Sequence, residues 1–471
     1  MPSAAVVGSG PNGLAAAIRL AQHGVAVTVY EAAATPGGGL RSAELLRSGV
    51  VHDVCSAVHP MALASPFFRY VGLRQYGLEF VWPEVDLVHP LADGSAGVLY
   101  RNISRTAAGL GVDAAMWQWS FGGFSRRFDK LLADALQPPV HVPHRPFLFG
   151  AFGANAALAA SWSWRRWRTA QATALFAGIA GHAFTRLDTA FSASVGHLLT
   201  VAAHAHGWPV AVGGSQAIAD AMVAKFRDLG GIIETNAAIS DRGELGDVDI
   251  VMLDTSPQAA ARILGNRQPA RLRSAYQRFR HGAAAVKVDF VTNGAVPWTN
   301  PEARRAGTVH VCGTAGQVAA AERQCARGIM PERPLVIVGQ QHLADPSRCS
   351  GSLQPLWAYA HVPAGYGGDA TTTIIDQIER CAPGFRDTIV ATHTMTTSDM
   401  EAYNPNYVGG DIIGGDSGVL QLLARPVLRP DPYFTGVAGV YLCSASTPPG
   451  AGVHGMCGAN AADRALRELS Q

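Results

Sequence analysis

The sequence predicts an α/β fold, and three observations predict it. Apolar residues 4–7 run directly into the glycine-rich turn Gly8-Ser9-Gly10-Pro11-Asn12-Gly13. A second apolar segment, residues 25–30, ends on Glu31. A third, residues 439–443, is followed by a loop and a final helix. Strands and helices in this order are typical of a parallel sheet that binds a nucleotide at the carboxyl ends of its strands.

The N-terminal turn has the pattern of a Rossmann-like phosphate-binding turn. Gly8 permits the tight strand-to-helix turn, Gly10 lets the backbone approach a pyrophosphate, and Gly13 lets the helix pack close to the sheet. The phosphates would lie at the positive end of the helix that begins near Pro11. Glu31 would accept hydrogen bonds from ribose hydroxyls and repel a 2′-phosphate. The candidate cofactor-binding residues of this unit are Gly8, Ser9, Gly10, Asn12, Gly13 and Glu31.

A second glycine cluster distinguishes FAD from NAD. Gly37, Gly38 and Gly39 follow Glu31 closely, and Arg41 comes just after them. This spacing resembles the extended FAD pattern of glutathione-reductase-like flavoproteins, in which a further turn and an arginine approach the same pyrophosphate. A flexible glycine-rich loop is the alternative. We take FAD as the expected cofactor, with Gly38, Gly39 and Arg41 among its candidate ligands.

Composition limits the function classes. A chain of 471 residues, 48% hydrophobic and 15% charged, is too long for one compact domain. The 37 basic and 35 acidic residues argue against a nucleic-acid partner. Seven scattered cysteines without a CxxC pair predict no metal site, no redox disulfide and a reducing, cytoplasmic setting. No signal peptide fits ahead of the first strand, and no apolar run is long enough to span a membrane.

Nucleotide-binding elements occur in three separate places, which predicts a discontinuous FAD-binding domain of residues 1–100, 206–271 and 425–471. In its second part, a helix at 217–229 follows Gly213 and Gly214, and strands are expected at 231–234, 237–239 and 249–254. Residues 101–205 should form a helical substrate-facing or membrane-facing region. Residues 272–424 should form a substrate-binding sheet, with strands at 285–290, 308–311, 335–339 and 356–362.

Aromatic and basic residues gather in the helical region. An apolar run begins at Phe147 and ends at Trp162, Trp164 and the cluster Arg165-Arg166-Trp167-Arg168. Aromatic residues beside cations suit a lipid headgroup boundary, so a peripheral membrane contact is one interpretation. A core helix with a solvated basic end is the other, and such clusters are common at ordinary surfaces.

Further motifs are spread along the whole chain, at 52–60, 207–209 with Gly213-Gly214, 296–298, 301–307, 404–406, 409–411 and 447–455. These motifs resemble those of the phytoene-desaturase-related FAD-dependent oxidoreductases. Within that family the chain is most similar to the branch of pyridine nucleotide-disulfide oxidoreductase domain-containing protein 2. The resemblance implies bound FAD, a fold shared with amine oxidases and carotenoid desaturases, and redox chemistry on an apolar substrate.

The C-terminal loop is the expected second half of the cofactor site. Pro448-Pro449 fixes the backbone, and the glycines Gly450 and Gly452 allow close approach. In the family that the chain resembles, the following helix, expected here from about Val453, points at the flavin N1–C2=O edge. Simple helix capping is the alternative. Many FAD enzymes of this fold hold the ribityl hydroxyls of the flavin with an acidic residue in this loop. Residues 443–447 contain no carboxylate, so serine hydroxyls or backbone groups must hold them here. The further candidate cofactor-binding residues are Ile239, Ser446, Gly452, Val453 and His454.

Histidines are the acid–base candidates. The candidate general bases are His59, His182, His361 and His454. The catalytic candidates are His59 and His454, because the first lies in the desaturase-like segment and the second at the expected helix start. Tyr359 is expected to line the substrate cavity. A packed or surface histidine is the alternative for each.

The leading hypothesis is an FAD-dependent dehydrogenase or desaturase that moves hydride from an apolar, polyene or lipid-like substrate to flavin N5. Because no second dinucleotide motif exists, electrons should pass to oxygen, a quinone or another acceptor. Two alternatives remain open: a flavin amine oxidase, and an FAD-binding interaction or membrane-associated protein with little turnover.

Overall fold

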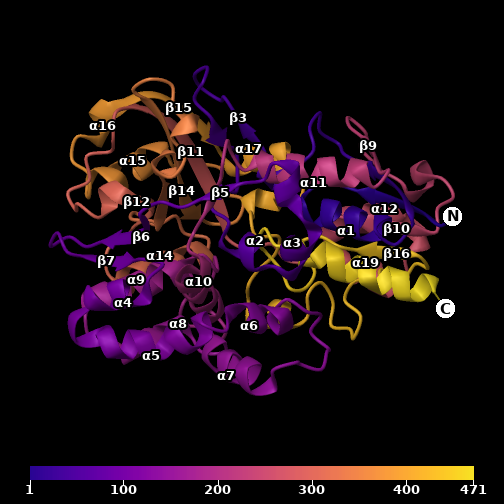
Figure 1. Ribbon diagram of the computed structural model, residues 1–471, viewed down its shortest axis with the longest axis horizontal. Coiled ribbons are helices and arrows are strands. Elements are labelled where there is room, and N and C mark those ends of the chain that lie inside the picture. The colour runs from indigo at the N-terminus through magenta and orange to yellow at the C-terminus, as the bar shows by residue number, and fades with distance from the viewer. Residues whose placement is uncertain (471) are drawn as a thin grey trace.

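The computed structural model describes residues 1–470 and contains two main sheets. The first sheet is entirely parallel, in the order β16-β10-β1-β2-β9. Three distant parts of the chain supply it, so indigo, rose and yellow strands lie together in Figure 1. Its strands are β1 (Ser3–Val7), β2 (Ala26–Tyr30), β9 (Ile232–Glu234), β10 (Ile250–Leu253) and β16 (Val440–Leu442).

Helices cover both faces of this sheet. Helices α1 (Pro11–Ala21) and α19 (Met456–Leu469) pack together on one face, and α11 (Gln216–Asp228) lies beside α1. A β-carbon at Gly458 would lie only 1.8 Å from the backbone oxygen of Asn12, so glycine is required where α19 meets α1. The other face packs against α12 (Pro257–Leu264) and α13 (Ala270–Gln277).

The second sheet has seven strands in the order β15-β11-β14-β13-β12-β6-β7. All neighbours are antiparallel except β12 and β6. Residues 85–99, which the sequence placed with the nucleotide-binding part, form two strands of this sheet instead, because β6 pairs with β12. The strands are β6 (Val85–Pro90), β7 (Ala96–Leu99), β11 (Ala284–Asn293), β12 (Ala306–Val311), β13 (Val336–Gly339), β14 (Leu353–Val362) and β15 (Ile389–Met395).

The two faces of the second sheet differ in chemistry. One face is apolar and packs against α15 (Thr371–Glu379), with Val286, Val288 and Ala358 in a common core. The other face carries buried polar and aromatic side chains. Lys287 pairs with Tyr359, Tyr359 pairs with Ile337, and Ile337 pairs with His310, so these residues share that face.

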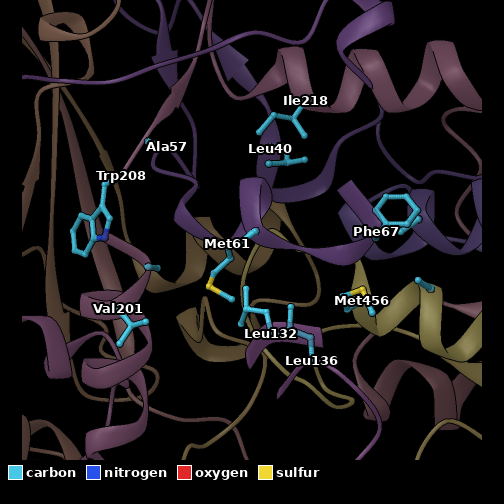
Figure 2. Packing of buried hydrophobic residues seen from close by; sticks show 14 of the residues in the cluster. Leu40, Ala57, Met61, Phe67, Leu132, Leu136, Val201, Trp208, Ile218 and Met456 are labelled. Carbon is cyan, nitrogen blue, oxygen red and sulfur yellow. The ribbon is translucent and has the colours of Figure 1, made fainter. Parts of the chain in front are cut away.

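Residues 103–206 are mostly helical, with loops at 136–145 and 182–192, and pack around Trp117, Phe121 and Trp167. Figure 2 shows where this region meets the rest of the molecule: Met61 lies near Leu132 and Leu136. The helices are α4 (Ile103–Ala108), α5 (Ala114–Ser125), α6 (Phe128–Ala135), α7 (Pro146–Ala156), α8 (Ala160–Ser163), α9 (Ala170–Gly181) and α10 (Ala193–His206).

Two further expectations were wrong in detail. Residues 237–239 are not a strand, because the backbone after β9 instead bonds to Glu31 and Ala33. Helix α19 begins at Met456, three residues after Val453.

None of the helices within residues 1–470 has both the length and the apolar character needed to cross a membrane. The remaining elements are β3 (Ser42–Ala43), β4 (His52–Asp53), β5 (Phe80–Val81), β8 (Val210–Ala211), α2 (Pro60–Ala64), α3 (Pro66–Val71), α14 (Ala315–Ala326), α16 (Phe385–Thr388), α17 (Thr397–Tyr403) and α18 (Val419–Leu423).

Candidate functional site

The glycine turn after β1 meets the second glycine cluster through bare backbone. Gly8 has φ of 98°, and Gly10 precedes α1 without a side chain to cap it. A β-carbon at Gly38 would lie 2.9 Å from the Cα of Gly10, and the amide of Gly37 donates to the oxygen of Ser9 (3.1 Å). The two clusters, distant in sequence, therefore form one continuous loop surface at the positive end of α1.

Asp254, directly after β10, packs against the glycine turn. The sequence alone did not predict a role for it. Its Oδ2 accepts the amide of Gly13 (2.8 Å) and would lie 2.8 Å from a β-carbon at Gly10. Burial raises its pKa to about 7, against the amide hydrogen bond from Gly13, and the nearby Glu31 raises it further. A β-carbon at Gly8 would lie 2.9 Å from the backbone oxygen of Asp254, and one at Gly13 would lie 2.9 Å from its Oδ2, so none of the three glycines can carry a side chain without a shift.

Glu31 stands at the tip of β2, as predicted, and its carboxylate already has partners. One oxygen accepts the amide of Ser9 (3.0 Å), and the other accepts the amide of Ala33 (2.8 Å) and the guanidinium of Arg41 (3.2 Å). Arg41 also lies over the ring of Tyr403. Ile239 is half-buried in the extended segment after β9, whose residue 237 donates its amide to the oxygen of Glu31.

The C-terminal loop is tied together by its own side chains. Ser446 donates its hydroxyl to the oxygen of Gly414 (2.9 Å), and its amide donates to Ser444 Oγ (3.3 Å). Gly452 and Val453 lie in this loop rather than in α19. The buried guanidinium of Arg425 donates to the oxygens of Ala445 and Gly415, while its Nε has no partner within residues 1–470.

The structure separates the two histidine candidates. His454 uses both ring nitrogens locally: Nδ1 accepts the amide of Met456 (3.0 Å), and Nε2 lies 3.2 Å from the oxygen of Gly450. His59 uses only Nε2, which lies 2.8 Å from Ser215 Oγ, and its buried Nδ1 has no partner among the described residues. Burial lowers the pKa of each imidazole to about 4, so both are neutral near pH 7.

A buried ion cluster holds the residue that faces His59. Ser215 donates its amide to Asp53 (2.7 Å), and Asp53 is paired with the guanidinium of Arg348. Arg348 also pairs with Asp345 (3.0 Å), which in turn accepts the amide of Gly213 (2.7 Å). The Gly213–Ser215 loop is thus fixed by two carboxylates that share one cation.

Segment 52–56 connects the glycine clusters to the polar face of the second sheet. The amide of Ser56 donates to the oxygen of Gly39 (3.0 Å), and His52 Nε2 lies 3.0 Å from the oxygen of Phe290 on β11. The same strand carries the fully buried ion pair Lys287–Asp289. A lysine and an aspartate two residues apart in an otherwise apolar strand are the sequence signal that would have found this pair.

Beyond this pair, aromatic rings line the face. Trp357, Tyr359 and His361 stack along β14 with ring centroids 5.5 and 5.8 Å apart, and Phe184 stacks on His361 at 3.9 Å. Tyr359 therefore lies on the buried polar face. His182 contacts His310 (3.0 Å between Nε2 atoms), remote from the glycine clusters in sequence and in the hydrogen-bond network. Within residues 1–470, no three histidine, cysteine, aspartate or glutamate side chains are arranged to hold a metal ion.

The arrangement fits a dinucleotide. The bare backbone of Gly10 and Gly38, the uncapped start of α1 and the buried, unpartnered Oδ1 of Asn12 form a polar cradle at the carboxyl end of the first sheet. The carboxyl ends of β1, β2, β10 and β16 all open on that edge, where ligands of open α/β sheets bind.

Comparisons with known proteins agree with this geometry. The profile of the NAD(P)-binding Rossmann-like domain family matches residues 6–71. Pyridine nucleotide-disulfide oxidoreductase domain-containing protein 2 of Mus musculus is 39% identical over 97 residues, and that of Rattus norvegicus is 38% identical over 97 residues. Each match covers 20% of this chain and only 16% of the relative.

Solved structures resemble the chain over its whole length. An oxidoreductase from Methanosarcina mazei has a TM-score of 0.63 at 14% identity and covers 100% of both chains. Putrescine oxidase has a TM-score of 0.64 at 18% identity, covering 100% of this chain and 99% of the other. Cyclohexylamine oxidase from Brevibacterium oxydans has a TM-score of 0.57 at 15% identity and covers 100% of both. At these identities the likeness establishes the fold.

The family match identifies a Rossmann-like nucleotide-binding domain at residues 6–71, and the solved structures show the fold of the whole chain. The predicted fold class, a Rossmann-like α/β domain with an added sheet and a helical region, is confirmed. The relatives that carry the resemblance to pyridine nucleotide-disulfide oxidoreductase domain-containing protein 2 match a fifth of this chain.

Proposed function

We propose that this protein is an FAD-dependent dehydrogenase or desaturase that takes hydride from an apolar, lipid-like or polyene substrate. One observation carries the proposal. The dinucleotide cradle of the first sheet is joined through segment 52–56 to a buried face lined by Trp357 and Tyr359. A cofactor held at the cradle and an apolar substrate on that face would be neighbours.

The proposed roles of the cradle residues follow from their chemistry. The uncapped start of α1, with Gly8 and Gly10, would hold the pyrophosphate, and Glu31 would hold ribose hydroxyls. Gly38, Gly39 and Arg41 would flank the same phosphates. Ser446 and the backbone of Gly452, Val453 and His454 would close the site from the last loop.

The chemistry that FAD supplies when bound is acceptance of two electrons, with hydride arriving at flavin N5. Trp357, Tyr359 and Phe184 would orient an apolar substrate and exclude water from it. His59 would accept a proton at its free Nδ1, since burial keeps the imidazole neutral. Electrons would then leave for oxygen, a quinone or another diffusible acceptor.

An amine oxidase is the second candidate, because stacked aromatic rings and a buried carboxylate lie on one face. Asp289 Oδ2 is buried without a hydrogen-bond partner within residues 1–470, 3.8 Å from His393 Nδ1, and Asp289 pairs with Trp357 of β14. A flavoprotein that mainly binds a membrane or partner is the third, and the exposed apolar helix described below favours it.

Spectra and anaerobic reduction test these proposals. We expect purified protein to be yellow and to release FAD on denaturation; a colourless protein that binds no added FAD would overturn the first two. Carotenoids, fatty acids, sterols and amines are then each mixed with the protein without oxygen. A compound that is a substrate should bleach the flavin, and we expect an apolar one to do so. Bleaching by amines alone would replace the desaturase by the amine oxidase, and bleaching by none would leave the binding protein.

A further inference from the structure

Helix α7 is an apolar helix that lies largely outside any core. Its sequence, PFLFGAFGANA, has no charged residue, yet only Phe152 and Ala156 are buried. Phe147 in its first turn is 93% exposed. A helix that is apolar on all sides belongs in a protein core or in lipid. Figure 1 shows α7 at the lower edge of the molecule, at the periphery of the helical region.

Other apolar side chains surround this helix. Trp119 of α5 is 76% exposed, and Val140, Val142 and Trp162 are also exposed. Together with Phe147 they come from four segments of residues 114–168, and large exposed apolar side chains gathered in one region mark an interaction site. This surface, which we call the α7 patch, comprises Trp119, Val140, Val142, Phe147 and Trp162.

A cavity of about 770 Å³ opens within the α7 patch, between α5, α6 and α7. Trp119, Phe124 and Leu148 give it an apolar lining, and Arg127, Lys130 and Arg145 add positive charge. No acidic residue lines it. The cavity therefore suits a ligand with an anionic group and an apolar chain.

The positive charge is concentrated here rather than spread over the molecule. Residues 114–168 contain seven arginines and lysines against two aspartates, whereas the whole chain has 37 against 35. Neither aspartate neutralises the lining cations. Asp129 pairs with Arg69, and Asp134 accepts the amides of His144 and Arg145. Within residues 1–470, Arg127, Lys130 and Arg145 form no ion pair.

We infer that the α7 patch docks the protein on an anionic phospholipid bilayer, with Phe147 and Trp119 in the headgroup–acyl boundary and Arg127, Lys130 and Arg145 on lipid phosphates. Val142 and Trp162 lie outside the cavity lining, so a soluble ligand in the cavity would leave them in water, whereas a bilayer covers them. The inference is independent of the redox reaction proposed above.

Vesicle flotation of the full-length protein tests the inference. We expect flotation with vesicles in which about a third of the lipid is phosphatidylglycerol, far less with pure phosphatidylcholine, and loss at about 0.5 M salt. The double variant Arg127→Gln/Arg145→Gln should bind roughly thirtyfold more weakly, because each basic residue near an anionic leaflet contributes roughly fivefold. Phe147→Ser should weaken binding about tenfold.

Matched controls come from another corner of the surface. Arg327 and Arg333 are exposed and form no ion pair among the described residues, and Ile329 is an exposed apolar residue between them. Arg327→Gln/Arg333→Gln and Ile329→Ser should leave flotation unchanged. A native circular dichroism spectrum and flavin content of each variant exclude misfolding.

Three results would overturn the inference. The first is equal flotation with both lipid compositions, or flotation that Arg127→Gln/Arg145→Gln does not weaken. The second is a Phe147-dependent dimer in light scattering without vesicle binding, which would assign the α7 patch to a second copy of the chain. The third is Phe147-dependent binding of monomeric decyl phosphate without vesicle binding, which would assign the cavity to a soluble ligand.

Discussion

Arg348 joins three parts of the chain that are far apart in sequence. Its guanidinium pairs with Asp53 and Asp345 and donates to the oxygen of Ala211, while its side chain is fully buried. Asp345 lies three residues before this arginine, but Asp53 and Ala211 come from distant segments, so the local sequence shows only one of its partners. Only the folded structure shows that the charge of Arg348 is needed to balance the two buried carboxylates of Asp53 and Asp345.

The variant Arg348→Met should destabilise the protein by about 3–5 kcal/mol, because it leaves two buried carboxylates without a cation. Arg267→Met, which removes an exposed pair with Asp241, should change stability by less than about 1 kcal/mol. Urea unfolding followed by circular dichroism measures both. Equal effects of the two substitutions would contradict the role given to the cluster.

The Asp254 carboxyl should make stability depend on pH. Its folded-state pKa of about 7 lies above the ordinary aspartate value of 3.8, so its contribution to stability is fully present below pH 4 and is lost as the pH rises toward 7. In Asp254→Asn, which cannot ionise, the free energy of unfolding should fall less over this range, by roughly 1–3 kcal/mol. Parallel curves for the two proteins between pH 4 and 7 would show that the carboxyl does not titrate there.

His59 and His454 should respond differently to substitution. His59→Ala should slow anaerobic flavin reduction by about a hundredfold or more, since it removes a proton acceptor with a free nitrogen. His454→Ala breaks two hydrogen bonds of the last loop and should lower flavin content and thermal stability more than the reduction rate per flavin. Stopped-flow reduction normalised to bound flavin separates the effects, and an unchanged rate in His59→Ala removes it as a catalyst.

At the level of elements, the contact between α1 and α19 depends on one missing methyl group. Gly458→Ala would bring a β-carbon 1.8 Å from the oxygen of Asn12, so α19 would have to move. We expect a loss of about 2 kcal/mol or more and weaker flavin retention. Gly153→Ala, in an open helical position, should be neutral or stabilising by up to about 1 kcal/mol. Thermal unfolding and flavin absorbance measure both; tolerance of Gly458→Ala would mean that the helices separate easily.

The sequence predicted elements with strong local patterns and missed those defined by distant partners. Residues 3–7, 26–30 and 440–442 form strands where apolar runs predicted them. Residues 237–239 have the same apolar character, yet they bond to the end of β2 as irregular backbone. The glycine turns were predicted because their backbone conformations require glycine, which the sequence shows directly. Asp254 was missed, because a charged residue at the end of a strand does not reveal what it faces, and the Lys287–Asp289 pair was missed although two charged residues in an apolar strand mark it.

For the whole molecule, cofactor binding should control stability. Residues that we propose as ligands come from all three segments of the first sheet, so a bound dinucleotide would link them. At FAD concentrations about a hundred times its Kd, the gain should be about 2.7 kcal/mol. Thermal scans with added FAD, NAD or NADP measure it. Only FAD should raise the midpoint; stabilisation by NAD alone would replace the expected cofactor.

The first sheet also constrains the order of events during synthesis. Strand β10 pairs on one side with β1 and on the other with β16, which begins at residue 440. Ribosomes therefore release the phosphate-binding turn long before the last strand exists. Until that strand docks, one side of β10 is an unpaired edge that other chains can join. A nascent chain of this topology therefore exposes that edge until synthesis is nearly complete, and if FAD binds as proposed, its loading would follow the docking of β16.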